Sequence, residues 1–349
     1  MDVVYSPLHR NHDAAEQVEY GQRLAMNECP ERGEDIHRAL RADPQFEFHV
    51  PAEHGVEPIT AVHDPALIAY LETAWSHYRA ALGPTGDTIL DAVADTYRHP
   101  GMFEGMPAPK EPVSPLGKLG YWCFDTTTPI VEGTFVAARA AVDVAVSATD
   151  LVLNGARSAY GLCRPPGHHA PRAAFGGYCY FNNAAISAQR AIESGAARVT
   201  ILDVDYHHGN GSQQLFWARG DVQYVSLHGD PARAYPYFCG FADEVGTGAG
   251  FGANMNIPLD EGCTDAEYLN ALNRACDVIQ QFGPSVIVVS LGVDTFHNDP
   301  LGDLALTTDS FRAQGTRIAD LGVPMVVIQE GGYDVTAIGA NVRSFLCGI

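Results

Sequence analysis

The chain has 349 residues, of which 46% are hydrophobic, so it is long enough to bury a large core. Its 42 acidic and 21 basic residues give a formal net charge of −21, which argues against a nucleic-acid partner. An acidic balance would attract cationic substrates, although an acidic surface that serves solubility alone is the more common explanation.

The eight cysteines are scattered and form no CxxC pair, which fits buried thiols in a reducing cytosol. The first residues contain no basic segment followed by an apolar one, so we expect no signal peptide. No apolar run approaches the ~18 residues that a membrane span needs. We therefore expect a cytoplasmic protein with no membrane partner.

The sequence of residues 1–82 predicts two short strands and two helices, the second of which is long. We expect a strand at residues 3–5, a polar loop, a helix near 31–41 and a second strand at 46–50. Residues 65–82 predict a helix, because apolar side chains recur there at a spacing near 3.6 residues.

Residues 83–130 differ from the rest of the chain in composition, because Gly, Pro and Met are frequent there. Only residues 88–98 of this segment have a helical pattern. A long irregular segment inside a compact chain is usually a functional lid, an oligomer contact or a disordered stretch. Its aromatic residues, which include Phe103 and Trp122, favour an ordered surface loop over disorder.

After residue 130, predicted helices and strands alternate regularly. The predicted helices are 134–153, 183–194, 213–219, 265–282, 308–321 and 335–347, and the predicted strands are 158–163, 198–204, 222–227, 285–293 and 324–329. Such alternation is typical of an α/β protein with a largely parallel sheet covered on both faces. No linker interrupts it, so we predict one domain over residues 1–349 with an insertion at about 83–130.

Residues of metal-ligand type follow two of the buried strands. Asp203, Asp205 and His207 point the same way, because side chains alternate between faces along a strand. Asp294 ends a later strand, so it should lie at the same edge of a parallel sheet. Asp205, His207 and Asp294 would form an Asp2His set with open coordination, as catalytic zinc requires. Taken singly, Asp294 could be the N-cap of a helix. Asp205 could likewise be a buried helix cap, with the His207 imidazole packed over it.

Two adjacent imidazoles, His168 and His169, follow the stiff segment Arg164-Pro165-Pro166-Gly167. Their position at the same sheet edge suits proton transfer near neutral pH, and a role as two further metal ligands is the alternative. Asp203 can accept a hydrogen bond from one ring, and Asn210 can orient the other. The Asn-paired imidazole should stay neutral and act as the base, since an amide raises a histidine pKa less than a carboxylate does.

The strand at 324–329 leads into Glu330-Gly331-Gly332-Tyr333. The two glycines allow close approach to the site, and the Tyr333 hydroxyl beside a metal would stabilise a developing oxyanion. A packing role for this tyrosine is the alternative. Together these groups predict a mononuclear metal hydrolase, in which activated water attacks an amide without a covalent intermediate.

The motifs RPPGHHA, FGGYCYFNNAA, LDVDYHHGNG, VSLHGDP, SLGVDTF and EGGY resemble those of the zinc-dependent histone deacetylase superfamily, particularly its bacterial acetylpolyamine amidohydrolase branch. The resemblance implies the three-layer arginase-deacetylase fold, with the catalytic metal at the carboxyl ends of the strands. It implies that Asp205, His207 and Asp294 hold one Zn2+ per chain, with Fe2+ as the alternative metal. His169 would then be the principal general base and acid, His168 its electrostatic partner, and Tyr333 the carbonyl clamp.

The resemblance implies further sites around this centre. A structural K+ would be held by Asp203, Asp205, His207, Ser226 and Leu227, and a second monovalent ion by carbonyls around Phe216, Arg219 and Val222. Tyr178 and Tyr235 would sandwich the methylene chain of the substrate, with Gly177 in the same tunnel wall. Arg32 would line an internal channel beneath the metal.

In the acetylpolyamine branch, a long loop like residues 83–130 builds a homodimer and narrows the tunnel mouth, so we expect a homodimer here. The positions where acidic residues would meet a distal ammonium hold Leu116 and Thr127. Leu301, near the tunnel entrance, is likewise not the glutamate of some eukaryotic polyamine deacetylases. The carboxylates close enough in sequence to substitute are Asp125, Glu104 and Glu111.

We therefore expect a zinc-dependent hydrolase of linear amides that removes acetyl or another short acyl group from small primary amines, acetylpolyamines first. A deacetylase of acetyl-lysine in proteins is the main alternative. A binuclear manganese ureohydrolase is a remote one, because the residues after Asp294 lack the further carboxylate pattern that two metals need. A non-catalytic binder of acylated ligands is disfavoured, since every catalytic position is filled.

Overall fold

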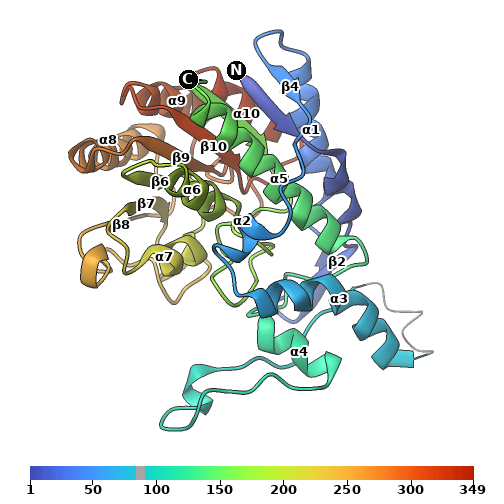
Figure 1. The fold of residues 1–349 in the computed structure, drawn as a ribbon. Coiled ribbons are helices and arrows are strands. Elements are labelled where there is room, and N and C mark those ends of the chain that lie inside the picture. The colour runs from blue at the N-terminus through green and yellow to red at the C-terminus, as the bar shows by residue number, and fades with distance from the viewer. Residues whose placement is uncertain (84–90) are drawn as a thin grey trace.

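The computed structural model describes residues 1–83 and 91–349 and has an eight-stranded, all-parallel sheet at its centre (Figure 1). The strand order is β4-β1-β5-β10-β9-β6-β7-β8. The strands are β1 (Asp2–Tyr5), β4 (Glu47–His49), β5 (Ser158–Leu162), β6 (Val199–Asp203), β7 (Val222–Gly229), β8 (Asn254–Leu259), β9 (Val286–Leu291) and β10 (Met325–Gln329). Every residue of β6, β7, β9 and β10 is buried, as expected for parallel strands covered on both faces.

Helices cover the two faces and create two hydrophobic cores. One core contains residues from α3 (Pro65–Leu82), α5 (Thr134–Leu153) and α6 (Asn183–Glu193). The other contains residues from α1 (Pro30–Arg41), α8 (Asp265–Phe282), α9 (Thr308–Ala319) and α10 (Ile338–Leu346). Alternate residues of β10 enter opposite cores: Val326 and Ile328 the first, Met325 and Val327 the second. This is the three-layer α/β architecture that the sequence predicted.

The structure also corrects the sequence prediction. The helices predicted at 65–82, 134–153 and 265–282 are confirmed to the residue, and the other predicted helices and strands, apart from the helix at 88–98, agree to within one helical turn. The predicted polar loop before residue 31 instead contains an antiparallel hairpin of β2 (Glu16–Glu19) and β3 (Gln22–Ala25). The elements α2 (Glu57–Thr60), α4 (Pro115–Trp122) and β8 were not predicted.

The helix predicted at 88–98 is wrong over the described residues 91–98, which contain a bridge from Ala92 to Ile130 and no helix. Residues 88–90 lie outside the described part of the chain. None of the helices in the ranges that the structure describes combines the length and apolar character needed to cross a membrane.

The parallel sheet brings distant segments together at one edge. Asp203 at the end of β6 is in register with Ser290 of β9 and with Ser226 of β7. Gln329 at the end of β10 is likewise in register with Leu291 at the end of β9. The loops that follow β5, β10, β9 and β6, which are adjacent strands, therefore converge above the same edge.

Candidate active site

Asp205, His207 and Asp294 meet where the chain leaves β6 and β9. One ligand atom from each residue lies within 4.8 Å of the others. The Nδ1 atom of His207 is 3.0 Å from Asp294 Oδ2 and 3.3 Å from Asp205 Oδ1. The structure thus brings together the three residues that the sequence singled out as metal ligands.

The chemistry of this group fits a divalent cation. Both carboxylates are fully buried, and their ion pairs within the described residues involve only His168 and His207. Burial, together with the charge of Asp205, raises the pKa of Asp294 to about 7. Two carboxylates and one imidazole that converge in a low-dielectric site form a donor set that a divalent metal would stabilise.

Gly331 lets the loop after β10 approach the carboxylates of Asp205 and Asp294 closely. Its backbone N–H donates to Asp205 Oδ2 at 2.7 Å. A Cβ atom at this position would lie 2.2 Å from Asp294 Oδ2 and 2.5 Å from Asp205 Oδ2. Any larger residue would therefore displace the carboxylates, which explains the glycine.

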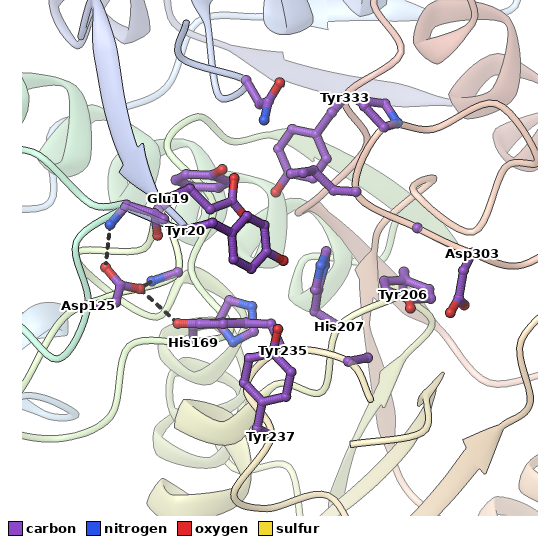
Figure 2. Close-up of a pocket in the computed structure, with 18 of the residues that line it drawn as sticks. Glu19, Tyr20, Asp125, His169, Tyr206, His207, Tyr235, Tyr237, Asp303 and Tyr333 are labelled. Carbon is purple, nitrogen blue, oxygen red and sulfur yellow. Dashed lines mark hydrogen bonds between the residues drawn. The ribbon is translucent and has the colours of Figure 1, made fainter. Parts of the chain in front are cut away.

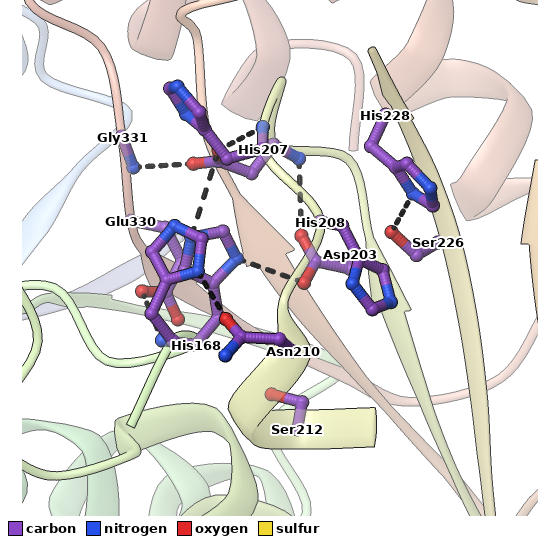
Figure 3. A network of polar contacts seen from close by, with 12 residues as sticks. His168, Asp203, His207, His208, Asn210, Ser212, Ser226, His228, Glu330 and Gly331 are labelled. Atoms are coloured by element: carbon purple, nitrogen blue, oxygen red, sulfur yellow. Dashed lines mark hydrogen bonds and ion pairs between the residues drawn. The ribbon is translucent and has the colours of Figure 1, made fainter. Parts of the chain in front are cut away.

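The two adjacent histidines have different partners, and Figure 3 shows His168 beside Asp203. His168 Nδ1 is 3.1 Å from Asp203 Oδ2, and His169 Nδ1 is 2.7 Å from Asn210 Oδ1. Burial opposes protonation of His168, but the charges of Asp205 and Asp203 outweigh it and raise the pKa to about 10. Burial and the neighbouring His168 charge lower the pKa of His169 well below its ordinary value. The pair thus combines one charged and one neutral imidazole, the division of roles that acid–base catalysis uses.

Glu330 anchors the histidine loop to the end of β10. Its Oε2 atom accepts hydrogen bonds from the backbone N–H of Gly167 at 2.6 Å and of His168 at 3.1 Å. Glu330 was expected only as part of the EGGY motif, with no predicted role of its own. A carboxylate directly before two glycines was the available signal, but its partners lie in the loop that follows another strand, β5.

A cavity of about 570 Å³ opens beside the group of Asp205, His207 and Asp294, and His207 is part of its lining (Figure 2). His169, His207 and Tyr333 line its inner part. The predicted tunnel residues Gly177, Tyr178, Tyr235 and Leu301 also line it. Asp125 braces this wall, because its Oδ2 atom accepts hydrogen bonds from Gly177 N at 2.6 Å and from the Tyr235 hydroxyl at 2.9 Å.

Sequence reasoning missed other lining residues of the cavity. Glu19 and Tyr20, at the turn of the β2–β3 hairpin, reach it from the amino-terminal part of the chain. Tyr206, Tyr237 and Asp303 add further aromatic and acidic groups to its lining. The hairpin could not be placed over the cavity from its own sequence, since that placement depends on contacts with distant loops.

Comparison with known proteins identifies the family. Residues 26–349 match the histone deacetylase domain. The chain belongs to the histone deacetylase family. It is 42% identical to an acetylpolyamine amidohydrolase of Mycoplana ramosa over 349 residues, covering 100% of this chain and 99% of that protein. It is 43% identical to acetylpolyamine amidohydrolase 1 of Pseudomonas aeruginosa, with 99% and 97% covered.

Solved structures agree with this assignment. The crystal structure of an acetylpolyamine aminohydrolase from Burkholderia pseudomallei matches with a TM-score of 0.93 and 37% identity, covering 100% of this chain and 98% of that one. The arginase-deacetylase fold expected from the motifs is thereby confirmed. As a histone deacetylase family member, the chain is a hydrolase of the deacetylase type.

The monovalent-ion sites that the histone deacetylase resemblance implied stay predictions. Asp203 and Ser226 do lie at the same register of neighbouring strands, and Ser226 Oγ is 2.7 Å from His228 Nδ1. The second predicted group, Phe216, Arg219 and Val222, surrounds the turn between α7 (Asn210–Phe216) and β7, where the Phe216 carbonyl accepts a hydrogen bond from Arg219 N at 2.9 Å.

Arg32 lies beneath the loop that carries Tyr333. Its Nε atom donates to the Gly332 carbonyl at 2.5 Å, and one terminal nitrogen donates to the Glu330 carbonyl at 2.6 Å. Glu28 binds the other terminal nitrogen at 2.6 Å, in a fully buried ion pair. Arg32 therefore holds the loop that carries Tyr333, in the region where an internal channel was predicted.

Proposed function

We propose that this protein removes acetyl groups from small primary amines, acetylpolyamines first among them, with one bound Zn2+. The observation that carries the proposal is that Asp205, His207 and Asp294 form one group beside an unlike histidine pair, and that His207, His169 and Tyr333 line one cavity. The substrate class is that of the acetylpolyamine amidohydrolases that match over the full length of the chain.

The residues around the cavity have distinct roles in the proposed reaction. Held by Asp205, His207 and Asp294, a zinc ion would supply a lowered pKa of water and polarisation of the amide carbonyl. The Asn210 Oδ1 atom can only accept, so it fixes the proton of His169 on Nδ1 and leaves Nε2 free as the base. Tyr333 donates a hydrogen bond to the oxyanion as it forms.

The same histidine pair completes the reaction. His169 returns the proton that it has taken to the nitrogen of the leaving amine, which breaks the amide bond. His168, charged through its contact with Asp203, stabilises negative charge that develops beside it. Acetate and the free amine are the products, and no bond to the protein forms.

We further propose that residues 83–130 are an insertion in a single domain and that this insertion builds a homodimer. The described part of the insertion projects away from the layered core around α4 (Figure 1). It exposes large apolar side chains: Met102 is 65%, Met106 64% and Val113 95% exposed. Exposed apolar groups of this size fit a contact surface. Light scattering that gives one chain per particle would rule the dimer out.

The deciding experiment measures kcat/KM of the zinc-loaded protein with acetylputrescine, acetylspermidine and an acetyl-lysine peptide in one assay. A clear preference for the free acetylated amines supports the proposal. A preference for the peptide would identify a protein deacetylase, and no turnover of any of the three would reject deacetylation of amines. Parallel reconstitution with Zn2+ and Fe2+ would decide which metal supports turnover.

A further inference from the structure

The cavity offers carboxylates to a cationic substrate, but they are not equally available. Glu19, Asp125 and Asp303 line it. The Asp125 carboxylate already accepts hydrogen bonds from Gly177 N and from the Tyr235 hydroxyl. Neither Glu104 nor Glu111, the other candidates from the sequence, belongs to the lining. Two carboxylates of the described chain, Glu19 and Asp303, therefore remain to meet a positive group in this cavity.

Glu19 is held against the tunnel wall by a chain of hydrogen bonds. Its Oε2 atom accepts from Gln17 Nε2 at 2.9 Å, and Gln17 Oε1 accepts from the Tyr178 hydroxyl at 2.9 Å. Burial and the charge of Glu19 both raise the pKa of Tyr178 above its usual value. The negative charge of Glu19 therefore acts on the Tyr178 ring, which lines the same cavity as His207.

Asp303 lies on the other side of the cavity, next to Tyr206 and across His207 from Glu19 (Figure 2). This side also holds a cation, because Arg233 lines the cavity, where its charge acts on Tyr206 in opposition to that of Asp303, and pairs with Asp260 at 3.7 Å. Opposite charges at one wall offset each other at short range. We therefore expect a substrate ammonium to be attracted more strongly to the Glu19 side.

We propose that Glu19, at the turn of the β2–β3 hairpin, binds the distal ammonium of the substrate and makes the enzyme prefer acetylated diamines over uncharged acetamides of equal length. The inference rests on the proposed deacetylation. Tyr20 and Tyr178 provide apolar ring faces for the methylene chain, and their rings also attract a cation. A half-buried carboxylate binds an ammonium more strongly than an exposed one, because less water competes.

The test compares two substrates that differ in one charge. We would measure kcat/KM for N-acetylputrescine and for N-butylacetamide, which has the same four-carbon chain without the ammonium, in wild type and in Glu19→Gln. We expect the ratio of the two values to favour the diamine in wild type and to fall at least tenfold in Glu19→Gln. Added salt should lower the wild-type ratio, since ions screen an attraction that water can reach.

Matched variants separate the outcomes. Glu16→Gln removes another carboxylate of the same hairpin, which lies 3.4 Å from Arg23 Nη1 and does not line the cavity, and should leave the ratio unchanged. An unchanged ratio in Glu19→Gln, or equal losses with both substrates, would overturn the role of Glu19. A fall in Asp303→Asn instead would move ammonium binding to the opposite wall. If wild type hydrolyses the uncharged substrate but shows no preference, only this inference fails and deacetylation stands.

Discussion

The guanidinium carbon of Arg32 lies 4.6 Å from the centroid of the Tyr333 ring. Arg32 belongs to α1, near the start of the chain, whereas Tyr333 follows the last strand of the sheet. A cation over an aromatic face holds the ring by electrostatic attraction. The orientation of the proposed oxyanion donor therefore depends on a helix that contributes none of the proposed metal ligands.

Tyr333→Phe keeps the ring over Arg32 and removes the hydroxyl alone. We expect kcat to fall by ~10²-fold or more, because the lost hydrogen bond stabilises charge that exists only in the transition state. KM and the free energy of unfolding should change little. Steady-state kinetics and urea unfolding would check both, and a near-wild-type kcat would remove Tyr333 from the mechanism.

Asp205→Ala removes a buried carboxylate from the proposed metal group. We expect tight zinc binding to be lost, since the remaining two ligands are too few for a stable site. Metal analysis after dialysis measures this. Asp2→Ala is the control, because Asp2, Glu47 and His49 form a second group of ligand-type residues on β1 and β4. Stoichiometric zinc in Asp205→Ala, or its loss in Asp2→Ala, would contradict the assignment.

Asn210→Asp places a carboxylate on the ring nitrogen of the proposed base. The new charge should raise the pKa of His169, so this histidine would stay protonated to a higher pH. The acid limb of the kcat/KM profile should therefore move to higher pH by about one unit. Profiles from about pH 5 to about pH 9 test this, and a limb that does not move would indicate a different base.

His63 makes the folded state sensitive to acid. Its Nε2 atom accepts from Asn182 N at 2.8 Å, its Nδ1 atom is 3.0 Å from the Pro171 carbonyl, and burial lowers its pKa to about 4. An unfolded chain takes up the proton near its usual pKa of ~6.5. This contribution to stability is thus complete above about pH 6.5 and decreases as the pH falls towards 4, by up to about 1.4 kcal/mol per pH unit.

The free energy of unfolding measured in urea at about pH 7 and about pH 5 tests this linkage. We expect His63→Gln to flatten the dependence on pH by about one proton, because glutamine keeps a donor and an acceptor but does not titrate there. His77→Gln, at an exposed position of α3, is the control and should leave the slope unchanged. Equal slopes in all three proteins would show that His63 is not responsible.

Elements with local signals were predictable from the sequence. The helix Asp265–Phe282 begins with a capping box between Thr264 and Glu267 and ends at Gly283 in the left-handed conformation. Asp205, His207 and Asp294 were predictable for a similar reason. Each lies within four residues of the end of a buried strand, and parallel strands end at one edge of the sheet.

The missed elements depend on contacts with distant residues. Strand β8 contains Asn254 and Asn256, which give it a weak strand pattern, and the side-chain amides of both bind Gln213 Oε1. Their partner lies on α7, so only the folded chain explains why these polar residues occupy a strand. The hairpin with Glu19 was missed for the same reason, since Gln17 is fully buried and its side chain binds the hydroxyl of Tyr178, which is distant in sequence.

The β2–β3 hairpin forms a sheet of its own and pairs with none of the eight central strands. The proposed metal ligands and proton-transfer residues follow β5, β6, β9 and β10, whereas the proposed ammonium contact lies on the hairpin. Residues 16–25 can therefore diverge between relatives without altering the reactive centre. Exchange of this ten-residue ribbon offers evolution, and protein engineering, a route to new amine preferences on an unchanged catalytic scaffold.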